Sequence, residues 1–538
     1  SYGIYTCSSS ENKIFRNNIT NNRCGIMLAW HSCQNTIVEN NITNNEDGVL
    51  LYESCNCNSV YANIIVANRQ IGMGLHNSSS NVLRHNTMSE NRWNFWVSGS
   101  IFPFLLNDVD SSNTVDGKAV YYWINESDRI VPSDAGYVAL VNCSHITMQN
   151  LRISNQGEGV LLAYTTNSVI SRNEMVRNYV GIALLNSSDN IIACDNITGS
   201  GDFSIYDAGI FLESSSNNNV SGNIIMATGR HGIHLDLSSN NSITRNNITN
   251  NQYGIELSAG SSGNILRSNS MVNNSYNFHV EGWSLSDFIN DIDVSNIVDD
   301  KPIYYWISRA NMSVPFDAGY VALVNCSRIT AENLNLTRNQ RGLLLVYTMD
   351  STITQNNLMN NRNGIYLQFS SNNSITRNNI KNNSFGIGFV RSNFSSIVEN
   401  NIANNDAAIL LEGSSNNSIY HNDFINNTNQ AYVHDSTNLW DNGYPSGGNY
   451  WSDYSKRYPN ATEIDDSGIW NTPYFIDANN KDNYPMIPEF PSFLILTLFM
   501  MATLLAVIVR ARRFMVKHSC IESSAFLEIS PDDRRRIT

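Results

Sequence analysis

A glycine followed by an apolar residue returns along most of this chain, usually after 22 or 23 residues. Between the glycines runs a second pattern, so that one unit reads roughly N-x-I-x-x-N-x-I-x-x-N-x-x-G-I-x-L-x-x-S. Self-similarity at a fixed period of this size indicates a solenoid. The glycines are Gly3, Gly25, Gly48, Gly72, Gly159, Gly181, Gly209, Gly232, Gly254, Gly342, Gly364 and Gly386, and Ala408 takes the same place once.

Each unit contains three short stretches in which apolar and polar residues alternate, and this period predicts β-strands. Such a unit cannot bury its apolar face alone, but it can stack on a copy of itself with strands about 4.8 Å apart. Asn side chains at equivalent turns can then form a hydrogen-bonded ladder. We therefore expect an all-β, right-handed parallel β-helix of about twenty coils, with about 22 residues and three strands per coil.

A longer repeat lies over the short one, because residues 81–184 match residues 264–367 at a constant offset of 183. Residues 134–144 and 317–327 are identical at every position. Aromatic residues and Pro are concentrated at about 100–136 and 283–319, and we expect these two inserts to form protrusions or a lid. The coils after them carry apolar residues at outward positions, which something must cover. These residues are Leu161, Ala163, Ala183, Leu185, Leu344 and Val346.

The composition excludes some partners. Only 15% of residues are charged, the formal net charge is -14 and the pI is near 5.1. Binding of nucleic acid phosphates requires clustered Lys and Arg, so we expect no nucleic acid partner. A cation or a polysaccharide is easier to accommodate.

With the repeat established, residues 1 to roughly 440 resemble the NosD-like β-helix repeats, also called carbohydrate-binding and sugar-hydrolase (CASH) repeats, of archaeal surface proteins. The segment 438–454, with its Trp, Tyr and Asp residues, resembles the end of that module. A second piece, residues 468–474, resembles the family as well, except that Trp470 and Asn471 stand where the family usually has Gly-Asp. The resemblance implies the fold, whereas β-helices serve binding, catalytic and structural functions alike. We expect repeats over 1–437 and an aromatic- and Asp-rich cap over 438–488.

The C-terminal region predicts a membrane anchor. Residues 493–509 form an uncharged apolar run of 17 residues, followed by Arg510, Arg512 and Arg513. This length is at the short end for a transmembrane helix, and the basic residues place the tail in the cytoplasm. Residues 489–513 also resemble the archaeal PEF-type sorting signal. We therefore expect an extracellular β-helix, an anchor over 489–513 and a cytoplasmic tail over 514–538. Sequons in the repeats could be glycosylated after export.

Acidic and basic residues converge in one place when the coils are aligned on their glycines. Two positions after Gly, the outward residues include His234 and Glu256; four positions after Gly, they include Glu213 and Asp236. Arg230 precedes the same strands. Stacked carboxylates would raise each other's pKa, as an acid/base or sugar-binding site requires. An ordinary solvated face with paired charges explains the same pattern.

Two further sets of residues are candidates for binding. Tyr122 and Trp123 in one insert, with Tyr305 and Trp306 in the other, are candidates for contacts with a glycan. Four aspartates of the cap carry the oxygen ligands that Ca²⁺ prefers, although no EF-hand spacing is present. They are Asp465, Asp466, Asp477 and Asp482. We expect that no cofactor is required. Copper binding is disfavoured because the ten histidines are dispersed along the sequence.

Two classes of function remain open. The first is a non-catalytic cell-surface protein that binds carbohydrate or builds the envelope. The second is a polysaccharide lyase, epimerase or hydrolase, in which Glu213, Asp236 and Glu256 act as acid and base while His234 and Arg230 steady the developing charge. The motifs of polygalacturonases and mannuronan epimerases are not found in this sequence.

Overall fold

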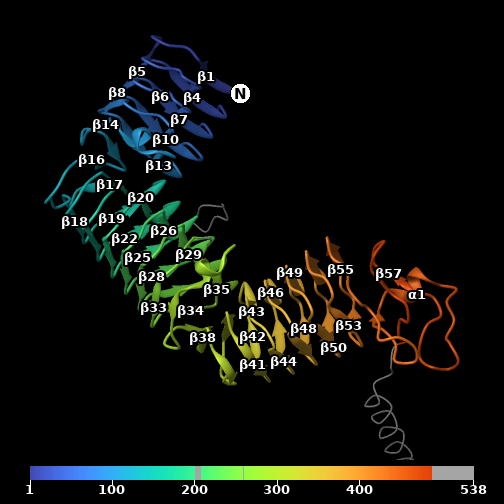
Figure 1. The fold of residues 1–538 in the computed structure, drawn as a ribbon. Helices are drawn as coiled ribbons and strands as arrows, with labels where there is room; N and C mark the ends of the chain where they lie inside the picture. Colours follow the sequence, from blue (N-terminus) through green and yellow to red (C-terminus); the bar gives the residue numbers. More distant parts are fainter. Residues whose placement is uncertain (200–206, 259, 488–538) are drawn as a thin grey trace, which may run out of the picture.

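The computed structural model describes residues 1–199, 207–258 and 260–487. These residues form an all-β solenoid of the right-handed type with about 19 turns. A typical turn contains two three-residue strands and one longer strand that begins beside the repeat glycine. In the first turns these are β2 (Lys13–Phe15), β3 (Asn18–Thr20) and β4 (Cys24–Ala29). Three stacks follow one another along the chain, and the molecule bends where they meet (Figure 1).

The longer strands form one sheet in each stack. In the first stack they are β1 (Tyr2–Cys7), β4, β7 (Asp47–Tyr52), β10 (Ile71–His76) and β13 (Trp93–Ser98). In the middle stack they are β17 (Ala135–Val141), β20 (Glu158–Ala163), β23 (Val180–Leu185), β26 (Ala208–Glu213), β29 (His231–Asp236), β32 (Tyr253–Leu257) and β35 (Tyr276–Val280). In the third stack they are β40 (Tyr320–Val324), β43 (Arg341–Val346), β46 (Asn363–Gln368), β49 (Phe385–Val390), β52 (Ala407–Glu412) and β55 (Asn429–His434).

Buried asparagines connect the coils as the sequence predicts. Asn40 donates through Nδ2 to Asn63 Oδ1 at 3.0 Å, and Asn63 donates in the same way to Asn86 at 2.9 Å. Each amide also donates to a backbone carbonyl of the preceding coil, as Asn63 does to Ile37 at 2.9 Å. Because the turn amides are buried, these bonds satisfy groups that water cannot reach. The ladder explains the abundance of Asn.

One ladder position carries an acid instead of an amide. Asp195 Oδ1 accepts from Asn173 Nδ2 at 2.9 Å, but Asp195 Oδ2 is buried and has no hydrogen-bond partner. Burial raises the pKa of Asp195 to about 7. Because the folded chain holds this proton more tightly than the unfolded chain, stability falls as the pH rises from about 4 to about 7.

We expect Asp195→Asn to stabilise the protein by about 2 kcal/mol at pH 8 and to change little at pH 3.5, because the amide restores the ladder. Urea unfolding followed by circular dichroism at both pH values measures the difference. A stabilisation of equal size at the two pH values would contradict this account.

The two inserts form corners of the solenoid, and Phe102 of the first insert also packs against the cluster that contains the outward apolar residues Leu161 and Ala163. In the first corner β15 (Thr114–Val115) pairs antiparallel with β16 (Lys118–Ile124), which then pairs parallel with β17. A sheet of short strands in the first stack thereby continues as the long-strand sheet of the middle stack. The second corner repeats this through β37 (Ile297–Val298) and β38 (Lys301–Ile307).

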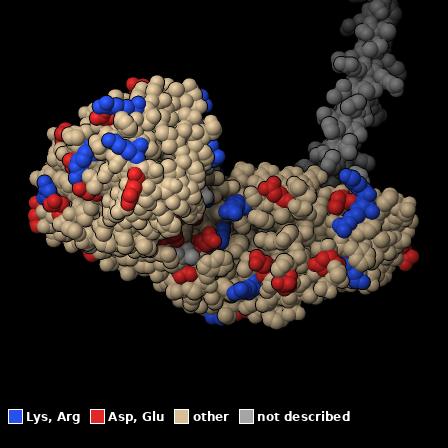
Figure 2. All heavy atoms as spheres, turned by 90° about the horizontal axis from the view of Figure 1, so that it is seen from above, with Lys and Arg blue, Asp and Glu red and all other residues tan. Residues whose placement is uncertain are grey.

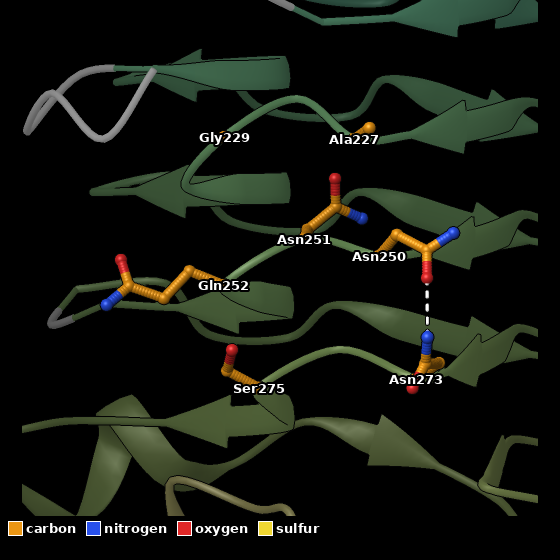
Figure 3. A pocket seen from close by; sticks show the side chains of 7 residues that line it. All are labelled: Ala227, Gly229, Asn250, Asn251, Gln252, Asn273 and Ser275. Carbon is orange, nitrogen blue, oxygen red and sulfur yellow. Dashed lines mark hydrogen bonds between the residues drawn. The ribbon is translucent and has the colours of Figure 1, made fainter. Parts of the chain in front are cut away.

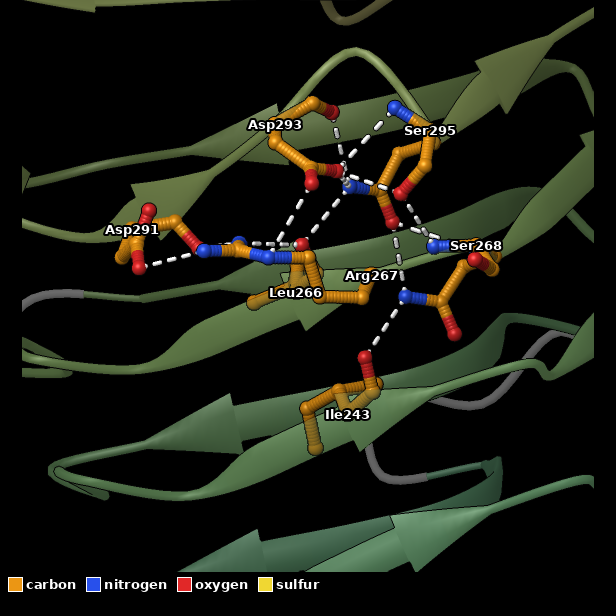
Figure 4. A network of polar contacts seen from close by, with 9 residues as sticks. Ile243, Leu266, Arg267, Ser268, Asp291, Asp293 and Ser295 are labelled. Atoms are coloured by element: carbon orange, nitrogen blue, oxygen red, sulfur yellow. Dashed lines mark hydrogen bonds and ion pairs between the residues drawn. The ribbon is translucent and has the colours of Figure 1, made fainter.

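An ion-pair network on the short-strand side is shared by both corners. Arg267 contacts Asp291 and lies 3.1 Å, through Nε, from Asp293 Oδ2 (Figure 4). In the first corner Arg84 contacts Asp110 in the same way, at 3.0 Å. Since the network occurs at both corners, we interpret it as part of the fold.

Each stack covers the outward apolar residues of the next. Leu161 and Ala163 are fully buried, and they pack in one core cluster with Trp93 and Phe102 of the first stack and its corner. Leu344 and Val346 of the third stack are buried in the cluster that contains Phe278 and Phe288. The prediction that these residues are covered is therefore confirmed. As a result, the long strands of all three stacks lie along the inner side of the bend (Figure 1).

The last coil is closed by aromatic residues of the segment 438–487. This segment contains β56 (Tyr450–Trp451), α1 (Tyr454–Arg457), β57 (Tyr474–Phe475) and β58 (Lys481–Asp482). Trp451 stacks on Phe424 of β54 (Asp423–Ile425) and on Tyr474. Within the part of the chain that the structure describes, no helix has the length and apolar character needed to cross a bilayer. The predicted anchor over 493–509 lies outside the described residues.

Candidate functional site

The predicted acid and histidine residues lie in two adjacent columns on the inner face of the middle stack. Strand register places Phe211, His234, Glu256 and His279 in successive coils of one column. Glu213 and Asp236 are paired neighbours in the second column, two residues farther along their strands. Because parallel strands lie about 4.8 Å apart, the side chains of each column form a continuous row.

Three histidines from two strands of the sheet gather around Glu256. His231 Nε2 lies 3.1 Å from Glu256 Oε2, and the His231 and His234 rings stack with centroids 4.4 Å apart. His279, one coil farther, places Nε2 3.2 Å from Glu281 Oε2. The interpretation that the histidines are dispersed was therefore wrong for three of the ten. The solenoid stacks residues that are about 22 positions apart, so sequence distance does not measure separation in space.

Burial and neighbouring groups shift the pKa values of these residues in opposite directions. Burial raises the pKa of Glu213, and the neighbouring Asp236 adds to this. Burial and Glu256 raise the pKa of Asp236. Burial also acts to raise the pKa of Glu256, but contact with His231 and the nearby His279 lowers it to about 2. Burial lowers the pKa of His234 to about 4. At neutral pH this surface therefore combines an ionised Glu256 with a neutral His234.

Arg230 lies just before β29, ahead of the strand residues that form the two columns. Its guanidinium lies over the Tyr253 ring, 5.8 Å from the centroid, and its Nε is buried without a hydrogen-bond partner. An open hollow of about 300 Å³ lies beside the start of the long strands, and Gly229, next to Arg230 in the chain, helps to line it. Figure 3 shows side chains of this hollow, including the Asn250–Asn273 hydrogen bond. The lining residues are Ala227, Gly229, Asn250, Asn251, Gln252, Asn273 and Ser275.

The insert aromatics are part of the core. Tyr122 and Tyr305 are buried, and their hydroxyls donate to Leu105 O at 2.6 Å and Phe288 O at 2.7 Å. Trp123 is also buried, with Arg129 over its ring, while Trp306 is half-buried against the core of the third stack. The prediction of a glycan surface is therefore contradicted for the three buried residues, and for the half-buried Trp306 it stays a prediction.

The acidic residues of the cap do not converge. Asp482 is fully buried and accepts from Trp451 Nε1 at 2.9 Å. Asp477 accepts from the backbone of Asn479 and Asn480 in the turn before β58. Asp465 and Asp466 lie in an exposed turn. Among the described residues, the group with metal-binding spacing is elsewhere: it comprises Glu256, His279 and Glu281.

Aromatic residues extend the inner face across the first stack. Trp30, Tyr52, His76 and Trp96 form a row in four successive coils, with neighbouring ring centroids 5.5 to 6.0 Å apart. Trp96 then contacts Tyr179 of the middle stack, at 4.8 Å. Most of the surface is uncharged, and acidic side chains lie in the hollow between the two lobes of Figure 2. The alignment of the coils on their glycines did not reveal this row. The equivalent positions of other coils hold Ala29, Leu50 or Gly74 in place of an aromatic residue.

The family model described as "Periplasmic copper-binding protein (NosD)" matches residues 1–121, 107–300 and 309–456. No relative was found among the curated proteins. A solved double mutant of the periplasmic alginate epimerase AlgG is 13% identical over 76% of this chain and 78% of its own, with a TM-score of 0.25. The catalytic domain of a GH87 α-1,3-glucanase in complex with nigerose is 13% identical over 74% and 65%, with a TM-score of 0.24.

Proposed function

Since this chain belongs to the NosD family of β-helix proteins, we propose that it is a cell-surface protein that binds an extracellular polysaccharide along its inner face without altering it. The family is described as periplasmic, which fits a location outside the cytoplasm. The predicted anchor at 493–509 would hold the β-helix at the membrane.

The observation that carries this proposal is the row of aromatic rings on the inner face of the first stack. Trp30 is about half exposed, and Tyr52 and His76 are partly exposed beside it. Such rings combine an apolar face with a polar edge, as a sugar ring does. They recur once per coil, with neighbouring ring centroids 5.5 to 6.0 Å apart, which suits the successive units of an extended polysaccharide. Beyond the corner, Glu213 and Asp236 supply hydrogen-bond acceptors for sugar hydroxyls.

We expect Trp30→Ala and Tyr52→Ala each to weaken glycan binding about fivefold, because each removes about 1 kcal/mol of ring contact. The full chain, purified in detergent, is tested against anionic and neutral polysaccharides by calorimetry. Tyr61→Ala is the matched control, since Tyr61 is exposed on β8 (Ser59–Tyr61), on a different sheet of the same stack. Equal affinity in all three variants would reject the aromatic row as the binding surface.

A second candidate function is a polysaccharide lyase, epimerase or hydrolase. The observation that favours it is the contrast in pKa between Glu256, at about 2, and the neighbouring Asp236, which is raised. An acid and a base with separated pKa values are what such chemistry needs. The same polysaccharides are monitored for unsaturated and reducing ends. Turnover that is lost in folded Asp236→Asn and His234→Ala variants would establish the enzyme and end the non-catalytic proposal.

A further inference from the structure

Three side chains with metal-ligand chemistry converge at the corner between the middle and third stacks. Glu256 of β32, His279 of β35 and Glu281 after β35 each offer one ligand atom, and these atoms all lie within 4.8 Å of one another. Two carboxylate oxygens and an imidazole nitrogen are a ligand set that divalent transition ions accept, with a further position open to water. The acids and the histidine come from neighbouring coils, so the stacked strands hold them rigidly.

Buried imidazole nitrogens without hydrogen bonds surround this group. The His279 side chain is 1% exposed, and its Nδ1 has no partner. The His231 side chain is 2% exposed and points at Glu256, yet neither of its ring nitrogens makes a hydrogen bond of good geometry. Buried polar atoms of this kind are uncommon unless they serve a ligand or a chemical function. This observation is independent of the spacing of the three ligands.

The duplicated corner shows that the fold does not require these residues. At the offset of 183, Trp96 and Ser98 occupy the first corner where His279 and Glu281 occupy the second. Arg341 faces the group in the second corner: its Nη1 donates to Val280 O at 3.1 Å. Its positive charge helps to hold two carboxylates close together before any ion arrives. The polar residues are therefore an addition to one copy of a shared architecture.

We propose that Glu256, His279 and Glu281 bind one divalent first-row transition ion of the Zn²⁺ or Cu²⁺ class. The description of the family names copper, and imidazole with carboxylate suits Cu²⁺ and Zn²⁺. Ca²⁺ prefers oxygen ligands alone, and Cu⁺ prefers sulfur, which this group does not contain. The ion would lie on the inner face, at the end of the column that holds His234.

Calorimetric titration of the full chain with Zn²⁺, after removal of bound metal with a chelator and without polysaccharide, tests this proposal. We expect one Zn²⁺ per chain, undisturbed by excess Ca²⁺. Glu281→Gln and Glu256→Gln should each weaken binding at least tenfold. Glu281 is partly exposed, so its variant is expected to fold even if the Glu256 variant does not. Cu²⁺ titration should show the same dependence.

Glu412→Gln is the matched control. Glu412 ends the long strand β52 at the position that corresponds to Glu281, but it lies outside the group. Its replacement should leave Zn²⁺ affinity unchanged. The proposal is overturned if the chain binds no Zn²⁺, if binding persists unchanged in a folded Glu281→Gln variant, or if Glu412→Gln weakens it equally. The outcome does not depend on whether the inner face binds a glycan.

Discussion

Replacement of Gly232 by alanine is expected to destabilise the protein by about 3 kcal/mol, because the interior cannot accept the added carbon. A Cβ at this position would lie 2.3 Å from Ile248 Cγ2 and 2.6 Å from the carbonyl oxygen of Gly254. The first contact is with the packed core, and the second is with the backbone of the next coil. The second contact would push β29 away from β32, which contains Gly254. The midpoint of urea unfolding, followed by circular dichroism, measures the loss.

The reverse change in the third stack is the control for this prediction. Ala408 occupies the glycine position there, and Ala408→Gly should cost less than about 1 kcal/mol, mainly through backbone entropy. If Gly232→Ala lowers the unfolding midpoint no more than Ala408→Gly does, close contact between coils is not the reason for the repeated glycine.

Removal of one ladder amide should have an effect of similar size. Asn246 accepts from the backbone N–H and the Nδ2 of Asn223, at 3.0 and 2.9 Å, and donates to Val220 O at 3.0 Å. Asn246→Ala leaves these buried groups without partners, and each such group costs about 1 to 3 kcal/mol. We expect a total loss of about 3 kcal/mol, measured by urea unfolding at pH 7.

The adjacent Asn247 provides the comparison for the ladder. It belongs to β31 (Asn247–Thr249), and its side chain is exposed. Asn247→Ala removes the same atoms from the next residue in the chain, and it should change the free energy of unfolding by less than about 0.5 kcal/mol. Similar losses in the two variants would show that burial of the amide does not matter.

The solenoid could be predicted from the sequence because its core requires the same residues in every coil. The isoleucines of each unit must point inward, the glycine must admit the next coil, and the Asn must satisfy the turn. Each of these residues recurs at the same position in every coil, so the period is visible in the sequence alone. The corners were harder to predict from the sequence. Each depends on an antiparallel pair of strands through which a short-strand sheet of one stack continues as the long-strand sheet of the next. Tyr122 and Tyr305 therefore resembled exposed aromatics, although they fill the interior.

The acidic columns were found from the glycine register, and the same register caused His279 and Glu281 to be missed. Asn277 stands where the next glycine would be, so the alignment ended at Gly254. Strand β35 nevertheless continues the sheet, with Tyr276 opposite Tyr253. Alignment on the inward apolar residues, Phe278 after Ile255, would have recovered the strand. The inner face as a whole could not be predicted, since it depends on the direction in which both corners turn.

Because the corner is duplicated, the number of stacks in the chain determines how far the solenoid curves. Met88 pairs with Val115 at the first corner, and Met271 pairs with Val298 at the second, so the two junctions share the same strand pairing. The 183 residues from one junction to the next comprise one stack and one corner. Gain or loss of such a segment would preserve the strand pairing at the corner and change the arc by one step. Addition of whole stacks would thus lengthen the curved solenoid, and each new stack could acquire its own functional residues on the inner face.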